Sequence, residues 1–424
     1  MKTQLLLAAI AAISTPFALC QDNVAVRGGK IVTITGPTIE DGVILIRNGR
    51  IAKIGGAGEV EVSWDATVVD AKGRYVLPTW VLAHTQGGMR GANENMQNVP
   101  YVSIGDAVDP ASPFFEDCLR NGVGTVNVLP GNETLLGGQG MVLRPYGRTV
   151  EDMAIRTSSG IKLSLWTQNN SGRLQQIRKL RRALEDVRDY VADFERRRRE
   201  FEEEKKAGAI PKDKEWTEEY DRMKKPVADL LAKKVKGWLF VPTAAEIEEA
   251  LRLAEELDLS IVLGRDIQRG IALLQKLKAP VVLDDQIEFY ETDPDTDQEK
   301  KINTAKLLAD AGIPFALSLG SGAASYPWWQ MATCVRGGVD RRTALEAMTI
   351  VPARMLGLED QIGSIAEGKM ANLQILTGDP LQATTWVDKV LLEGRVVYTR
   401  EDDPRLRYLL VPPAAENEAK GEGK

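Results

Sequence analysis

The stretch Arg74-Tyr-Val-Leu-Pro-Thr-Trp-Val-Leu-Ala-His84-Thr-Gln86-Gly-Gly88 is the starting point for interpreting this chain. Its apolar residues predict a buried strand, and the polar residues and glycines after them predict a turn at the end of that strand. His84 is the single histidine among 424 residues. Any chemistry that needs an imidazole must therefore use this position.

Before this stretch, residues 24–77 predict short antiparallel strands. Asn48-Gly49 between two apolar runs is the strongest hairpin signal among them. Residues 371–398 repeat the same pattern, which predicts that the two ends of the chain pair with each other. We expect a composite β-sandwich domain built from residues 21–77 and 360–411.

From Pro78 onward, short apolar strands alternate with amphipathic helices. This alternation predicts an α/β fold with a parallel sheet, and residues 78–359 fit a (β/α)₈ TIM-like barrel. Residues 172–236 depart from the pattern and predict a charged helical-hairpin insertion. Its apolar residues recur at three- and four-residue steps, and a second helix is expected at 216–236 after a turn. The charges predict a face of the insertion that is exposed to solvent. The alternative is that the insertion is an arm that docks a partner.

The first residues resemble a secretory signal. Lys2 precedes the apolar run 5–13, which is too short to span a bilayer. Cleavage after residue 20 predicts a signal peptide at 1–20 and an exported protein, periplasmic or extracellular. Lipidation of Cys20 is the alternative, although Leu19 fits that signal poorly.

Composition limits the partners. The net charge of −6 and the pI near 5.3 do not favour a nucleic-acid surface, and no later segment is apolar for long enough to span a membrane. Cys118 and Cys334 predict two buried free thiols, with one long-range disulfide as the alternative. Residues 412–424 predict a disordered polar tail.

Four motifs carry a family resemblance. They are, in chain order, Asp70-Ala-Lys-Gly-Arg-Tyr-Val-Leu-Pro78, Gly122-Val-Gly-Thr-Val-Asn-Val-Leu-Pro-Gly131, Leu136-Gly-Gly-Gln-Gly-Met-Val-Leu143 and Leu356-Gly-Leu-Glu-Asp-Gln-Ile-Gly-Ser-Ile-Ala-Glu-Gly-Lys369. With the order of the parts, they resemble the amidohydrolase superfamily, in particular imidazolonepropionase-like metal-dependent hydrolases. The resemblance implies a barrel with a composite β domain, a zinc centre and hydrolysis of C–N bonds. The glycine-rich segment around Gln139 is expected to be a loop at the barrel mouth.

The positions that bind metal in this family are changed here. The resemblance implies Asp-x-His-x-His at the end of the first barrel strand, where this chain has Leu82, His84 and Gln86. The stretches that match the fifth and sixth strands contain no histidine, and Gly320 stands where the family's catalytic aspartate is expected. Lys162 matches the neighbourhood of the family's carbamylated lysine only loosely, and a strand lysine with a pairing partner is the alternative.

The chemistry of zinc, taken without the family resemblance, also argues against a metal centre in this chain. A catalytic zinc takes about three protein ligands, mostly histidine with a carboxylate, and leaves one position for water. This chain offers one imidazole, and the amide of Gln86 is a poor substitute for another. We therefore expect no metal cofactor and name no catalytic residue.

The sequence thus predicts a pseudoenzyme of the amidohydrolase type. It would bind a small ligand or an active homologous subunit, as a homo- or hetero-oligomer. The candidate pocket residues are His84, Gln86, Gln139, Lys162 and Ser321. The alternative is an active hydrolase of non-peptide or cyclic amide C–N bonds with an altered site.

Overall fold

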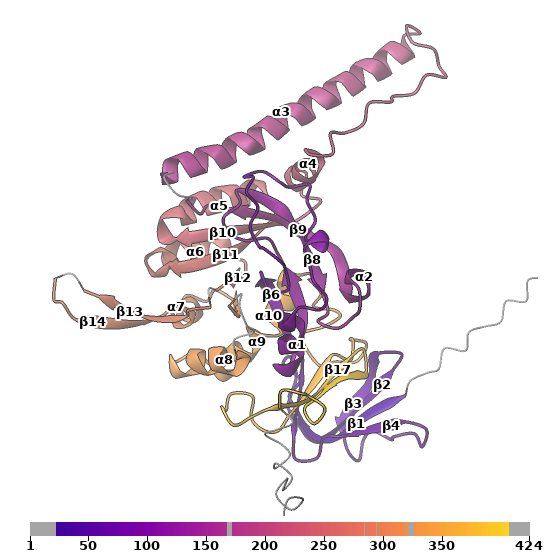
Figure 1. Cartoon of the computed structure of the whole chain (residues 1–424), viewed down its shortest axis with the longest axis vertical. Helices are drawn as coiled ribbons and strands as arrows, with labels where there is room; N and C mark the ends of the chain where they lie inside the picture. The colour runs from indigo at the N-terminus through magenta and orange to yellow at the C-terminus, as the bar shows by residue number, and fades with distance from the viewer. Residues whose placement is uncertain (1–22, 168–171, 284, 294, 321–325, 407–424) are drawn as a thin grey trace, which may run out of the picture.

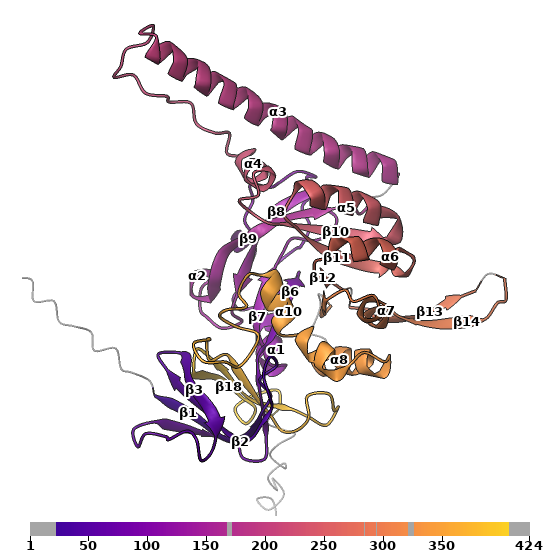
Figure 2. The same cartoon turned by 180° about the vertical axis from the view of Figure 1, so that it is seen from behind.

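A computed structural model describes residues 23–167, 172–283, 285–293, 295–320 and 326–406. The expected signal peptide, Ser321 and the expected tail lie outside these ranges. The structure is α/β, as the sequence predicts. A sheet from both ends of the chain lies at one end of the molecule, a second large sheet forms the middle, and helix α3 (Arg173–Lys206) projects at the other end (Figures 1 and 2).

The terminal sheet joins distant parts of the chain. Its strands are β1 (Val24–Ile31), β2 (Ile39–Arg47), β3 (Arg50–Gly56), β4 (Thr67–Asp70), β5 (Tyr75–Pro78), β16 (Leu373–Leu376), β17 (Val387–Leu392) and β18 (Arg395–Thr399). They follow the order β18-β17-β16-β5-β1-β2-β3, with β4 also paired to β1. The antiparallel pairing of β5 with β16 shows that the two ends of the chain share this sheet.

Strand β1 is where the terminal sheet forks. Its first half pairs with β4 and its second half with β5, on either side of Gly28 and Gly29. A Cβ atom on Gly29 would lie 2.7 Å from Val76 Cγ2, so glycine allows β1 and β5 to approach each other. The strands that pair with the first half of β1 and those that pair with its second half therefore belong to one hydrogen-bonded sheet. The predicted hairpin at Asn48-Gly49 is confirmed, because both residues have positive φ angles and join β2 to β3.

The middle sheet follows the order β15-β12-β11-β10-β9-β8-β7-β6. Its strands are β6 (Trp80–Thr85), β7 (Val123–Val128), β8 (Leu136–Leu143), β9 (Ala154–Ser164), β10 (Gly237–Thr243), β11 (Leu259–Asp266), β12 (Val281–Val282) and β15 (Phe315–Ala316). Neighbouring strands are parallel, except that β8 runs antiparallel to both β7 and β9. This hairpin-like excursion departs from the all-parallel sheet that the sequence predicts.

The two edges of the middle sheet, β15 and β6, have no ladder between them in the described residues. Residues 347 and 348 bridge them instead. The carbonyl of Met348 accepts from the Val81 amide at 2.9 Å, and the carbonyl of Ala347 accepts from the Leu317 amide at 3.0 Å. The helix after this bridge, α10 (Ile350–Met355), lies against both edges.

Strand β8 corrects the expectation of a loop around Gln139. The glycines of this segment serve close packing within a strand. The amide of Gln139 bonds to the carbonyl of Val102 at 2.8 Å, and a Cβ on Gly138 would lie 2.5 Å from that carbonyl oxygen. Repeated glycines resemble a loop signal in the sequence, but here they leave room for a crossing segment.

Gly138→Ala should therefore destabilise the protein by about 2 kcal/mol, because the added methyl group clashes with backbone that cannot rotate away. Urea unfolding followed by circular dichroism measures the loss. Gly58→Ala is the matched control, because nothing lies within 4 Å of a Cβ there, and its effect should stay within about 0.5 kcal/mol. Equal effects of the two substitutions would contradict this role for Gly138.

The remaining elements mostly cover the middle sheet. The other helices are α1 (Pro113–Arg120), α2 (Val150–Met153), α4 (Lys225–Leu231), α5 (Ile247–Glu256), α6 (Ile271–Leu274), α7 (Thr304–Asp310), α8 (Pro327–Arg336) and α9 (Arg341–Glu346). Single 3₁₀ turns lie at Ile104–Asp106, Ala244–Glu246, Gln268–Gly270 and Gln275–Leu277. A hairpin that the sequence analysis missed, β13 (Glu288–Thr292) with β14 (Glu299–Asn303), projects from the body (Figure 1). Cys118 and Cys334 are free and buried.

The insertion contains one long helix rather than a helical hairpin. Helix α3 spans 34 residues, but the expected second helix is reduced to the seven residues of α4. Residues before α4 lie along α3, where the ring centroids of Tyr220 and Trp216 are 4.2 and 5.9 Å from that of Phe194. Trp216 and Tyr220 are four residues apart, a spacing that is typical of a helix. Their position in the structure is instead determined by stacking on α3. None of the described helices is long and apolar enough to cross a membrane.

Candidate functional site

The side chains on one face of the middle sheet form an apolar cluster. Alternation along the strands gathers them there, and they include Val81, Ala83, Leu129, Trp238, Phe240, Val262, Val282 and Ala316. Residues on the opposite face belong to a second cluster, together with helix residues such as Phe114 and Cys118. Lys162 on β9 lies on the same face as the first cluster, which is called the inner face from here on. Its side chain is completely buried and lies beside Phe240 of that cluster.

A β-bulge in β6 brings His84 to this inner face. Leu82 pairs with Val126 and Thr85 with Val128, so β6 has one residue more than β7 between these two pairs. Leu82, at the position of the family's carboxylate, packs on the opposite face with helix α1. His84 instead contacts Lys162 from β9. The bulge thus separates two positions that simple alternation would place on one face.

His84 and Lys162 form a buried pair. Lys162 Nζ lies 2.8 Å from His84 Nε2. Burial, and then the nearby Lys162 charge, holds the pKa of the His84 imidazole well below its usual range. Burial lowers the pKa of the Lys162 amine to about 7. Because the imidazole is neutral, its Nε2 accepts a hydrogen bond from Lys162 in the tautomer that carries its proton on Nδ1.

An aromatic ring, that of Phe240, lies beside the amine. Lys162 Nζ lies 5.7 Å from the centre of the Phe240 ring, which in turn lies 6.1 Å from the ring of Trp166. Phe240 is buried, whereas Trp166 is 44% exposed. Trp238 is fully buried beside them, and its indole donates to the carbonyl of Ser159 at 2.9 Å. Trp166 thus contacts Phe240 and is partly exposed, whereas Trp238 is buried.

The other predicted pocket residues are not joined to this pair by a hydrogen bond in the described structure. Gln86 is half-buried at the end of β6. Gln139 donates to the carbonyl of Pro100 and accepts from Ser158, both at 3.3 Å, which holds its side chain within β8. Ser321 lies outside the described residues. Of the five predicted pocket residues, the structure therefore brings His84 and Lys162 into contact, and it shows no five-residue pocket among the described residues.

Asn127 is a polar residue beside the pair that the sequence analysis did not select. Its side chain is completely buried and donates to the carbonyl of Ala83 at 2.8 Å, next to His84. Its Oδ1 atom has no hydrogen-bond partner in the described structure. A single asparagine in the apolar run Val126-Asn-Val128 was the available signal, since a buried amide must serve a structural or binding purpose.

The donor set does not fit the zinc that the family resemblance implies. A zinc ion bound to His84 through Nε2 would need the lone pair of that nitrogen. The same nitrogen lies 2.8 Å from Lys162 Nζ and is engaged with the amine. The amine carries no carboxylate partner in the described structure, and its neighbours are aromatic or aliphatic. Within the described ranges, no three histidine, cysteine or carboxylate side chains gather into a group that could hold a metal. The pair His84 and Lys162 is therefore an arrangement of a base and an amine rather than a zinc site.

Comparisons with known proteins agree on the family. Residues 282–398 match the model of the "Amidohydrolase family". An imidazolonepropionase from Flavobacterium psychrophilum is 22% identical over 436 aligned positions, which cover 88% of this chain and 97% of that protein. A 5-methylthioadenosine/S-adenosylhomocysteine deaminase from Moorella thermoacetica is 40% identical over 68 residues, 16% of each chain.

Solved structures give the same result. The crystal structure of an amidohydrolase from Thermotoga maritima superposes with a TM-score of 0.77 and 27% identity, covering 89% of this chain and all of the other. An adenosine deaminase from Xanthomonas campestris with bound zinc, at a TM-score of 0.52 and 15% identity, shares the fold. With the order of elements described above, these matches lead to one conclusion. The chain belongs to the amidohydrolase superfamily.

Proposed function

We propose that this protein is a pseudoenzyme of the amidohydrolase superfamily, which binds a small ligand or an active homologous subunit and does not hydrolyse C–N bonds with a metal. The contact between Lys162 Nζ and His84 Nε2 carries this proposal. It engages the chain's single imidazole with the amine of Lys162, in a chain that offers no second imidazole. Hydrolysis by a zinc-bound water needs several such ligands directed at one point.

Three further features belong to this proposal. The middle sheet is a (β/α)₈ barrel whose closure passes through the bridge at residues 347 and 348, a view supported by the fold of the superposed amidohydrolase. The arm formed by α3 and the residues stacked on it is the surface for a homologous subunit. The protein is exported, periplasmic or extracellular, after removal of residues 1–20.

A hydrolysis assay tests the proposal. The substrates are the natural substrate of imidazolonepropionase and a set of cyclic amides, each supplied with and without zinc. We expect no turnover above background, and no difference between the wild-type protein and His84→Ala, because His84 is not part of a hydrolytic centre. Zinc-dependent turnover that disappears in His84→Ala would instead support the alternative, an active hydrolase with an altered site.

A further inference from the structure

Lys162 is an unusual residue in this fold, because it is a completely buried amine without an acidic partner among the described residues. In the described structure its amine contacts the imidazole of His84 and the ring of Phe240. Its aliphatic stem lies against β8, where a Cβ on Gly137 would be 3.2 Å from Lys162 Cβ. Buried lysines are normally paired with a carboxylate, since an isolated ammonium is costly in an apolar surrounding.

The surroundings of Lys162 favour a neutral, nucleophilic amine. No described carboxylate compensates a charge on Nζ, and the lowered pKa of about 7 agrees with this geometry. A lysine that is desolvated in an apolar pocket is the usual nucleophile for forming a Schiff base with a carbonyl compound. The pair also lies near the C-terminal ends of β6 and β9, the end of parallel strands at which ligands bind in α/β folds.

We infer that Lys162 captures a small aldehyde reversibly as a Schiff base, with His84 as the group that transfers protons. The inference rests on the proposed function, because a zinc centre would require His84 as a ligand. It names the class of ligand as a carbonyl compound. Phe240, whose ring lies beside the amine, also contacts the half-exposed Trp166.

The chemistry of the capture balances without any redox partner. The lone pair of Nζ attacks the carbonyl carbon and a C–N bond forms, while one of the two amine protons passes to the carbonyl oxygen, which becomes a hydroxyl group. His84 Nε2, 2.8 Å from Nζ, accepts a proton from the nitrogen and returns it to the hydroxyl group, which leaves as water. The products are one imine and one water, and hydrolysis reverses the step.

Reductive trapping tests the capture on the full-length mature protein. Acetaldehyde and sodium cyanoborohydride are added at pH 7, where hydride reduces the imine to a stable ethylamine, and peptide mapping by mass spectrometry locates the product. We expect Lys162 to be ethylated at least about tenfold faster than an exposed lysine, because no described carboxylate holds its amine in the charged form and His84 Nε2 lies 2.8 Å from Nζ. Lys234, whose side chain is 70% exposed, is the internal reference.

A variant separates the role of His84 from simple exposure of the amine. His84→Gln retains a polar side chain but cannot transfer a proton, so ethylation of Lys162 should slow by about tenfold or more while Lys234 is unaffected. The wild-type measurement needs no variant and is not affected by misfolding. Ethylation of Lys162 no faster than that of Lys234 would overturn the inference. If the protein also lacks zinc, the pseudoenzyme proposal survives that result.

Discussion

Lys162→Met is expected to raise the free energy of unfolding at pH 7 by about 2 to 3 kcal/mol. Folding lowers the pKa of this amine from an ordinary value of 10.5 to about 7. The unfolded chain therefore binds a proton that the folded protein does not, which costs on the order of 4 kcal/mol near neutral pH. Methionine removes this cost. It also leaves His84 Nε2 without its partner, which offsets about 1 to 2 kcal/mol.

The sign of the effect changes with pH. Between pH 7 and 10.5 the unfolded state binds more protons, so the stability of the wild-type protein rises with pH by about 1 kcal/mol per unit. The advantage of Lys162→Met should shrink over this range and reverse near its upper end. Urea titrations at pH 7 and 9.5 measure this, with Lys234→Met as the exposed control. Parallel pH profiles of the wild-type protein and Lys162→Met would show that the amine is not desolvated.

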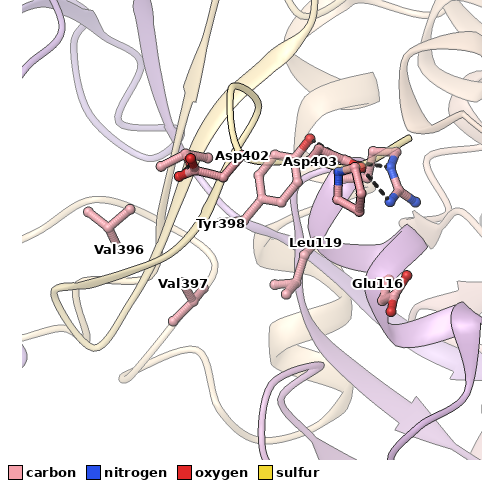
Figure 3. A pocket seen from close by; sticks show the side chains of 10 residues that line it. Glu116, Leu119, Val396, Val397, Tyr398, Asp402 and Asp403 are labelled. Carbon is pink, nitrogen blue, oxygen red and sulfur yellow. Dashed lines mark hydrogen bonds and ion pairs between the residues drawn. The ribbon is translucent and has the colours of Figure 1, made fainter. Parts of the chain in front are cut away.

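Asp403→Asn is expected to destabilise the protein by about 3 kcal/mol. Asp403 is buried beside a pocket of about 340 Å³ between α1 and β18, as Figure 3 shows. Its carboxylate accepts from Arg120 at 2.6 and 3.1 Å and from the Tyr398 hydroxyl at 3.1 Å. These bonds tie the C-terminal strands to the helix after β6. An amide in this position would leave the Arg120 guanidinium with only one of its two carboxylate partners, Asp117.

This effect should also depend on pH. Burial favours the protonated form of Asp403, but hydrogen bonds from Arg120 and the Arg405 amide, with the Arg120 charge, hold its pKa below the ordinary 3.8. Its contribution to stability is therefore complete above pH 3.8 and is lost as the pH falls through the lower folded value. Denaturant unfolding at pH 7 and 3 measures the change. Asp402→Asn, on the exposed neighbour, should have little effect, and equal losses in both variants would refute this role of Asp403.

Much of the fold could be predicted from local patterns. The Asn48-Gly49 hairpin and helix α1 depend on short-range turn chemistry and amphipathic spacing, which the sequence contains in full. The second helix of the insertion and the supposed loop at Gln139 were wrong for a common reason. Trp216 and the glycines of β8 take their conformations from partners far away along the chain. No local window contains that information.

The candidate site could be predicted in part. The sequence placed His84 and Lys162 among five pocket residues, because His84 is the single histidine at the end of a strand and Lys162 loosely matches the family's carbamylated lysine. Their direct contact depends on the bulge between Leu82 and Thr85, which shifts His84 to the inner face. An extra residue in one strand leaves no mark on an apolar pattern. For the same reason the sequence could not show that Asn127 lies beside His84.

The metal content of the purified protein tests the central claim most directly. Inductively coupled plasma mass spectrometry, after purification without chelators, should find far less than one zinc per chain, and His84→Ala should not change that amount. The reason is that the single imidazole is held by Lys162 and no second one is available. One tightly bound zinc per chain that is lost in His84→Ala would contradict the account.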